Sequence, residues 1–75
     1  MNPEDIKTLI EAALPGATVS VSGEGGKYEA TVISDAFDGM NTVKRHQRVY
    51  QIVDEHIASG AIHALSIKAL LPDEA

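Results

Sequence analysis

The sequence predicts an α+β domain whose elements follow the order helix, strand, strand, helix, strand (αββαβ), with short extra helical turns. Three observations support this order. An amphipathic N-terminal segment ends at Pro15-Gly16, two alternating segments over residues 17–33 are joined by a glycine-rich turn, and a long amphipathic segment precedes a last alternating segment. Each predicted strand has one polar face, so we expect a three-stranded mixed sheet with helices on one face only.

The N-terminal helix carries signals for both its start and its end. Asn2 can cap it, Pro3 suits its first position, and Asp5 stands where a capping acid reaches back to the cap. Pro15-Gly16 then ends the helix. The apolar residues that follow the spacing of one helical face are Ile6, Leu9, Ile10, Ala13 and Leu14.

Residues 17–33 predict an antiparallel hairpin. The apolar residues of its first strand alternate with serine and threonine, and those of its second strand alternate with Glu29 and Thr31. Between the strands, Ser22-Gly23-Glu24-Gly25-Gly26 is expected to form the turn. The inward-facing residues are expected to be Ala17, Val19, Val21, Tyr28, Ala30 and Val32.

The longest helix is predicted from Thr42 to about Ser59, and Gly60 provides its stop. A helix of this length can cross over the sheet, so the last strand, residues 62–69, is expected to lie parallel to a neighbouring strand. The inward-facing residues of the helix are expected to be Val43, Val49, Tyr50, Val53 and Ile57. Those of the strand are expected to be His63, Leu65, Ile67 and Ala69, with His63 at its mouth.

Length and composition limit the function classes. A chain of 75 residues forms one small domain, residues 1–75, with little room for a deep substrate cleft. No cysteine is present, so a disulfide, a thiol nucleophile and a self-contained iron–sulfur cluster are excluded. No segment has the roughly 20 apolar residues of a membrane span, and no secretory signal is recognisable, so we expect a soluble cytoplasmic protein. The net charge of −5 argues against bulk attraction to nucleic acid.

Four segments of the chain together resemble the BolA family. These segments are Phe37-Asp38-Gly39, Val43-Lys44-Arg45-His46-Gln47-Arg48-Val49-Tyr50, Ile62-His63-Ala64-Leu65-Ser66-Ile67-Lys68-Ala69 and Leu71-Pro72-Asp73-Glu74. The similarity spans nearly the whole chain, and the spacing of the segments is specific. It implies a class II KH-like fold, with helices on one face of a three-stranded mixed sheet, which agrees with the element order above.

His63 is the most informative candidate for a functional residue. A lone histidine beside an apolar row is commonly a structural residue hydrogen-bonded to a carbonyl group, but a neutral ring nitrogen can also ligate a metal. The resemblance to BolA proteins implies the second role, as a ligand of a [2Fe-2S] cluster shared with a monothiol glutaredoxin. Imidazole can replace thiolate on one iron of such a cluster. Since this chain has no cysteine, the sulfur ligands would come from the glutaredoxin and from glutathione.

The hairpin turn departs from the family pattern. Related proteins usually carry a cysteine or histidine ligand there, whereas this chain has Lys27, and a protonated lysine cannot ligate a ferric ion. Three alternatives follow: His63 is the only ligand from this chain, another group such as His46 substitutes, or the shared cluster is labile. His46 borders the buried face of the long helix, where packing and a functional role are both open. His56 lies on another side of that helix, so these two histidines cannot share one metal.

The only basic cluster consists of Lys44, Arg45 and Arg48, which make up half of the six lysine and arginine residues. Positive charge at a helix start opposes the helix dipole at a cost of roughly 0.3–1 kcal/mol per residue. A phosphate backbone, the carboxylates of glutathione or an acidic partner surface could offset that cost. The alternative is an ordinary solvated face paired with local acids such as Asp38. Because proteins similar to BolA are implicated in DNA binding and transcriptional control, the cluster is also a candidate contact for duplex DNA.

No enzymatic site is legible in the sequence. It has no Ser-His-Asp or paired-carboxylate arrangement and no phosphate loop before a helix. We therefore expect a non-enzymatic BolA-like adaptor that pairs with a monothiol glutaredoxin, in iron–sulfur cluster trafficking or iron homeostasis. The alternative is a DNA-binding transcriptional regulator that acts through the KH-like fold and the basic start of the long helix.

Overall fold

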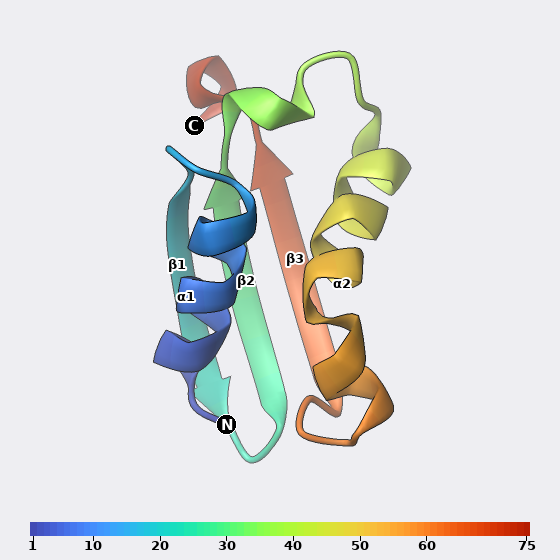
Figure 1. Ribbon diagram of the computed structural model, residues 1–75. Coiled ribbons are helices and arrows are strands. Elements are labelled where there is room, and N and C mark those ends of the chain that lie inside the picture. Colours follow the sequence, from blue (N-terminus) through green and yellow to red (C-terminus); the bar gives the residue numbers. More distant parts are fainter.

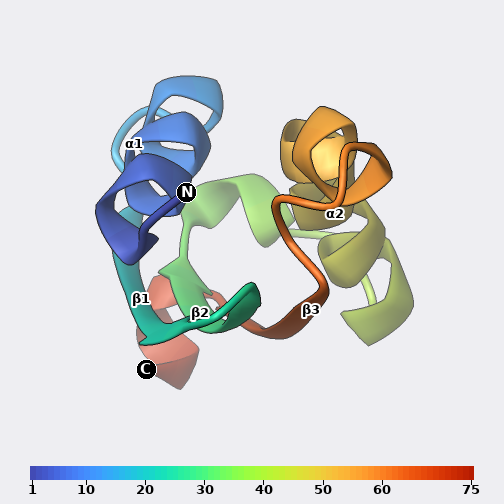
Figure 2. The ribbon, with the colours of Figure 1, turned by 90° about the horizontal axis from the view of Figure 1, so that it is seen from below.

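Two helices lie on one face of a three-stranded sheet in the computed structural model, which describes residues 1–75 (Figure 1). Figure 2 shows α1 and α2 on the same side of the sheet, whose other face is uncovered. The predicted αββαβ order is confirmed, and the short extra helical turns are two 3-10 helices. The elements are α1 (Pro3–Ala13), β1 (Thr18–Glu24), β2 (Lys27–Ile33), η1 (Asp35–Phe37), α2 (Thr42–Ala58), β3 (Ala64–Leu70) and η2 (Pro72–Glu74).

The first turn of α1 is closed by reciprocal hydrogen bonds. The Asn2 side chain accepts from the backbone N–H of Asp5 at 3.0 Å, and the Asp5 carboxylate accepts from the backbone N–H of Asn2 at 3.0 Å. Pro3 is the first helical residue, where its missing N–H leaves no bond unmade. The start predicted for this helix is therefore confirmed. Neither α1 nor α2 is long and apolar enough to cross a membrane.

The hairpin closes through a tighter turn than the sequence predicted. β1 and β2 pair as far as Glu24 and Lys27, so that only Gly25 and Gly26 form the loop. Both glycines have positive φ angles, 64° and 82°, as a two-residue type I′ turn requires. The predicted five-residue turn from Ser22 is wrong because two adjacent glycines permit the strands to continue to the very end of the hairpin.

β2 is the central strand of the sheet. It pairs antiparallel with β1 and parallel with β3, in a register that runs from Lys27 beside Ala64 to Ile33 beside Leu70. α2 supplies the crossover that a parallel pair requires. The mixed sheet predicted from the length of this helix is confirmed.

The core fills the space between the sheet and the two helices. Its 13 buried apolar residues are Ile6, Ile10, Leu14, Val19, Tyr28, Ala30, Val32, Phe37, Val49, Val53, Ile62, Leu65 and Ala69. Five residues predicted to face inward are exposed: Ala13, Val43, Tyr50, Ile57 and His63. For the three in α2 the reason is that this helix covers β3, an edge strand, so no further strand lies under its outer side (Figure 1).

Candidate functional site

His63 lies between the end of α2 and the start of β3 and contacts Gly26 of the hairpin turn. Figure 1 shows these segments at one end of the molecule. The sequence predicted a strand over residues 62–69 with His63 at its mouth. β3 instead begins at Ala64, so His63 precedes the strand by one residue. Its neighbour Ile62 is buried, and the Ile62 backbone N–H donates to the His56 carbonyl oxygen at 3.0 Å. The backbone that carries His63 is therefore anchored by the core on one side and by the end of α2 on the other.

The imidazole of His63 is exposed, and it makes no hydrogen bond or ion pair within the protein. Only its backbone N–H is used: it donates to the Gly26 carbonyl oxygen at 2.7 Å, and the N–H of Ala64 donates to the same oxygen at 3.1 Å. A structural histidine would direct a ring nitrogen to a carbonyl group. Here both ring nitrogens are free for a ligand from outside the chain.

The hairpin turn packs directly against the imidazole. A Cβ atom on Gly26 would lie 2.3 Å from Cδ2 and 3.1 Å from Cγ of His63. No side chain fits at position 26 unless the ring moves away. Glycine at this position therefore serves two purposes, because it also adopts the positive φ of the turn.

Lys27 is next to this site in the chain but belongs to the other face of the sheet. In the parallel register Lys27 stands beside Ala64, whose side chain is on the uncovered face, while His63 precedes the core-facing Leu65. Successive side chains of a strand alternate between faces. Lys27 is therefore on the uncovered face of the sheet, whereas His63 lies in the bend before β3.

The other two histidines are both half-buried on α2. His56 is in the last turn, close in the backbone to Ile62. His46 is ten residues earlier, about 15 Å away along the helix axis at 1.5 Å per residue. The structure does not bring His46 to His63, and it contains no cluster of three or more His, Cys, Asp or Glu side chains that could hold a metal ion.

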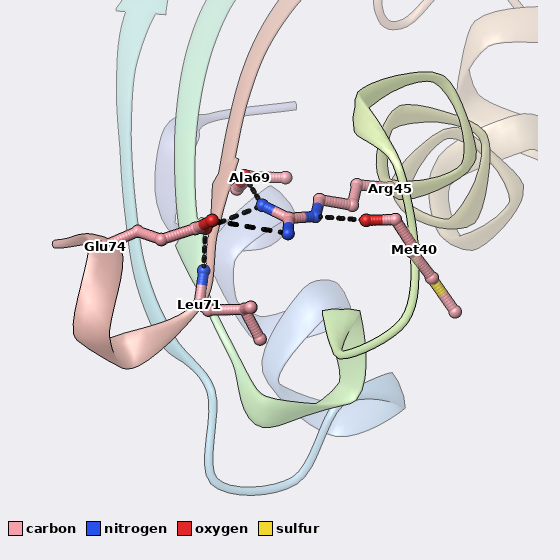
Figure 3. A network of polar contacts seen from close by, with 5 residues as sticks. All are labelled: Met40, Arg45, Ala69, Leu71 and Glu74. Carbon is pink, nitrogen blue, oxygen red and sulfur yellow. Dashed lines mark hydrogen bonds and ion pairs between the residues drawn. The ribbon is translucent and has the colours of Figure 1, made fainter.

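The basic cluster at the start of α2 is divided by the fold. Arg45 is held by the protein itself: Nε donates to the Met40 carbonyl oxygen at 3.0 Å, and Nη1 donates to the Ala69 carbonyl oxygen at 3.2 Å (Figure 3). Nη1 also lies 2.7 Å from Oε1 of Glu74. Lys44 is exposed and Arg48 is half-buried, without ion pairs. Within the cluster, only these two therefore keep charges that no acid of the chain neutralises.

Glu74 completes this network from the C-terminal segment. Its Oε1 accepts a second hydrogen bond from the backbone N–H of Leu71 at 2.7 Å. The hydrogen bond from Arg45, followed by that from Leu71, holds the pKa of Glu74 below its ordinary value of 4.5. The sequence-based interpretation named Asp38 as an example of a local partner for the cluster, whereas the ion pair joins residues 29 positions apart, for which no short-range pattern exists.

Two shallow hollows lie away from His63. One, of about 340 Å³, is lined by residues from η1 and the C-terminal segment, including Asp35, Asp38 and Asp73. The other, of about 500 Å³, lies on the outer side of α2 beside Gln47, Tyr50 and Asp54. Neither is an enclosed apolar pocket of the kind that holds a small-molecule substrate.

The geometry can be compared with known proteins. The sequence profile of the BolA-like protein family matches residues 10–74. The chain belongs to the BolA family. A BolA homologue from Coxiella burnetii has a TM-score of 0.86 and 40% identity, covering 99% of this chain and 95% of that one. The BolA fold, with two helices on a three-stranded mixed sheet, is thus shared with solved structures.

Two further BolA relatives have informative names. The acid stress protein IbaG of Escherichia coli strain K12 is 40% identical over 74 residues, which cover 99% of this chain and 88% of IbaG. The BolA domain of SufE1 from Arabidopsis thaliana has a TM-score of 0.84 at 32% identity, covering 97% of this chain and 94% of that one. In the second case a BolA unit occurs as one domain of a SufE protein.

Proposed function

We propose that this BolA protein is a non-catalytic adaptor that pairs with a monothiol glutaredoxin and provides His63 as one ligand of a [2Fe-2S] cluster shared by the two proteins. The observation that carries the proposal is the exposed imidazole with two free nitrogens on an anchored backbone. An imidazole nitrogen is a known ligand for one iron of such a cluster. A ligand on a fixed backbone also loses little conformational freedom when it binds.

This chain can provide one ligand to the cluster, the imidazole of His63. It has no cysteine, and His63 belongs to no group of three or more His, Cys, Asp or Glu side chains that could hold a metal ion. Three alternatives followed from Lys27 in the hairpin turn. His63 as the only ligand from this chain has the most support, because lysine is not a ligand of the kind that such clusters use and His46 is remote along α2. The thiolate ligands then come from the cysteine of the glutaredoxin and from glutathione.

The residues around His63 position it and leave its ring accessible. Gly26 gives the ring space on the side of the hairpin, and Ile62 fixes the backbone from the core. When present, the shared cluster would supply transferable iron and sulfide or a redox centre. We place this activity in cytoplasmic iron–sulfur trafficking and stress response, which accords with one relative being an acid stress protein and another being joined to a SufE protein.

Binding of duplex DNA is the second candidate, and it has less support. The sequence-based prediction relied on three basic residues, of which Arg45 is held in the internal network with Glu74. If Lys44 and Arg48 alone contact phosphates, binding releases about two counterions. The logarithm of the binding constant then falls with the logarithm of the salt concentration with a slope of about −1.8, since each neutralised phosphate contributes roughly −0.9. A titration of duplex DNA at several salt concentrations with Lys44→Ala and Arg48→Ala variants tests this candidate.

The adaptor proposal is tested by co-expressing the chain with a monothiol glutaredoxin in the presence of glutathione. The purified complex is expected to be coloured, with visible absorption and circular dichroism bands of a [2Fe-2S] cluster. His63→Ala is expected to abolish the complex or change these bands, because one iron loses its nitrogen ligand. His56→Ala is the matched control. It removes a half-buried imidazole of α2 but keeps the backbone carbonyl that accepts from Ile62, so it is expected to behave like the parent chain.

Two results would count against the adaptor proposal. One is an unchanged spectrum and stoichiometry of the complex with His63→Ala. The other is an equal loss with His56→Ala, which would indicate a general effect of removing a histidine rather than loss of a ligand.

A further inference from the structure

The hairpin contains a third glycine, Gly23, which lies in β1 and not in the turn. It pairs with Tyr28 of β2. Its φ angle is +127°, a backbone conformation that residues with a side chain rarely adopt. Gly25 and Gly26 already account for the turn itself. A glycine with this φ inside a paired strand therefore requires an explanation of its own.

A side chain at position 23 would collide with the backbone of the central strand. An ideal Cβ there would lie 2.2 Å from the carbonyl oxygen of Lys27 and 2.8 Å from Cα of Tyr28. Of the six glycines, only Gly23 and Gly26 have any neighbour within 4 Å of such an atom. Because β2 is paired on both sides, it cannot easily move away. The part that would yield is the hairpin tip, residues 24–27, which would leave the sheet in another direction.

The hairpin tip carries the carbonyl group that anchors His63. The Gly26 carbonyl oxygen accepts from the backbone N–H of His63 at 2.7 Å and from that of Ala64 at 3.1 Å. In the parallel register, Lys27 stands beside Ala64. A change in the direction of the tip therefore moves the Gly26 carbonyl away from these two N–H groups, and the imidazole loses its support.

We propose that Gly23 is a positioning residue for His63. Its positive φ directs the hairpin tip so that Gly26 meets the backbone of residues 63–64. The inference rests on the proposed function, which makes His63 the cluster ligand, and it extends the site to a residue of β1 that is 40 positions earlier in the chain. Gly23 itself acts only through the tip, since the atoms nearest to it belong to Lys27 and Tyr28.

NMR spectra of the free chain test the positioning role directly. In Gly23→Ala the imidazole signals of His63 are expected to shift. The amide hydrogens of His63 and Ala64 are expected to exchange with solvent about tenfold faster than in the parent, because their acceptor moves. The amide of Val32, a fully buried residue of β2, is the internal reference for global unfolding.

Gly16→Ala is the matched control. It also forces alanine into a positive φ, of 85°, but a Cβ at position 16 meets nothing within 4 Å. This variant is expected to lose stability and to keep the imidazole signals of the parent. The exchange of the His63 and Ala64 amides relative to that of Val32 is expected to stay unchanged as well.

A second control concerns Tyr28, which is opposite Gly23. The Tyr28 hydroxyl donates to the Met1 carbonyl oxygen. Tyr28→Phe removes this hydrogen bond without altering the backbone of β2, so it is expected to lower stability and to leave the His63 signals in place. Shifts of His63 that are equal in Tyr28→Phe and Gly23→Ala would mean a general loosening of this end of the molecule and would overturn the proposal.

The complex with a monothiol glutaredoxin provides a spectroscopic test. Gly23→Ala is expected to change the visible circular dichroism bands of the [2Fe-2S] cluster, and Gly16→Ala is expected to match the parent. The two proposals can fail separately. If His63→Ala leaves the bands unchanged, the adaptor proposal fails, whatever the free chain shows. If His63→Ala changes the bands but the free Gly23→Ala chain keeps the imidazole signals of the parent, only the positioning role fails.

A measurement on the parent chain covers the case in which Gly23→Ala does not fold. Amide exchange at increasing urea concentrations gives the free energy of each local opening. The amides of Lys27, His63 and Ala64 are expected to share one opening, which costs less than that of Val32, because all three depend on the hairpin tip. Exchange of His63 and Ala64 with a urea dependence different from that of Lys27 would overturn the proposal.

Discussion

At the scale of single residues, the candidate site depends on a pair that are 37 positions apart in the chain, Gly26 and His63. The backbone carbonyl of Gly26 accepts two hydrogen bonds from the segment that carries the imidazole. Its missing side chain leaves the space that the ring occupies. The glycine thus determines where the exposed ring lies, without any chemical role of its own.

Substitution of Gly26 by alanine is predicted to move the imidazole. Both Gly25→Ala and Gly26→Ala force alanine into a positive φ, which costs roughly 1–2 kcal/mol of stability each. Only the Cβ at position 26 collides with His63, since nothing lies within 4 Å of one at position 25. Urea unfolding is expected to show similar losses for both variants, while the imidazole signals of His63 in NMR spectra shift only in Gly26→Ala. Equal imidazole shifts in the two variants would contradict this reading of the contact.

At the scale of secondary structure elements, side chains from α2 close the free edge of β3. The carbonyl oxygens of Leu65 and Ala69 face away from β2, and they accept hydrogen bonds from Tyr50 and Arg45 respectively. An unpaired strand edge is a site for unwanted strand addition, and covering it with a helix is a common protection. Arg45 also connects this edge to η2 through Glu74, which ties the C-terminal segment to the sheet.

The contact between Arg45 and Glu74 predicts a pH dependence of stability. The pKa of Glu74 is lower in the folded chain than its ordinary value of 4.5, so folding favours the ionised carboxylate. The stabilisation from the ionised Glu74 is fully present at pH values above its ordinary pKa of 4.5. It is lost as the pH falls through the lower pKa that Glu74 has in the folded chain. The difference in melting temperature between the parent chain and Glu74→Gln is therefore expected to shrink between about pH 6 and pH 3.

Asp73→Asn is the control for this measurement, because the neighbouring Asp73 side chain makes no hydrogen bond or ion pair. Its melting temperature is expected to follow the parent chain more closely at every pH. Since Glu74 is 41% exposed, solvent screens the ion pair and the effect should be small. If the difference in melting temperature between the parent chain and Glu74→Gln grows as the pH falls, the pKa of Glu74 is not lowered by folding and the account is contradicted.

Element starts were predictable because their signals are local. The cap at Asn2 lies within three residues of its partner Asp5, and the alternation of β2 and β3 separates inner from outer residues without further information. The outer side of α2 was not predictable in this way. Periodicity aligns Val43 and Ile57 with the core-facing residues, but it does not indicate that β3 is an edge strand with nothing beyond it.

The candidate site was predictable in part for a related reason. The alternation of residues 62–69 placed His63 beside the core-facing row, and the lack of cysteine required external thiolates. Its contact with Gly26 depends on the parallel pairing of β2 with β3, and the network of Arg45 depends on where η2 returns to the sheet. Both are long-range consequences of the fold, which a pattern of neighbouring residues does not contain.

At the scale of the whole molecule, the two polar features lie at opposite ends of an elongated body that measures 32 × 19 × 18 Å. The hairpin turn and the start of β3 are at one end, while η2 and the start of α2 are at the other (Figure 1). The core between them consists of only 13 buried apolar residues. Changes in the network of Arg45 are therefore expected to affect stability without altering the surroundings of His63.

Such a small core makes the molecule sensitive to single cavities. A domain of 75 residues has a stability of roughly 4–11 kcal/mol. Phe37 of η1 is fully buried, and Phe37→Ala is expected to lower the free energy of unfolding by about 3–5 kcal/mol, a large share of that stability, as measured by urea unfolding. Phe37→Leu retains most of the volume and is expected to stay folded at a cost of about 1 kcal/mol. A loss in Phe37→Ala no larger than that in Phe37→Leu would contradict this account of the core.

The central claim is that an imidazole nitrogen of His63 binds an iron shared with a glutaredoxin. Pulsed electron paramagnetic resonance of the reduced complex tests it most directly, with ¹⁵N-histidine incorporated only in the BolA chain. We expect a hyperfine coupling from one ¹⁵N ligand that is retained in His56→Ala and absent in His63→Ala. A cluster-containing complex of the parent chain without any ¹⁵N coupling would contradict the claim.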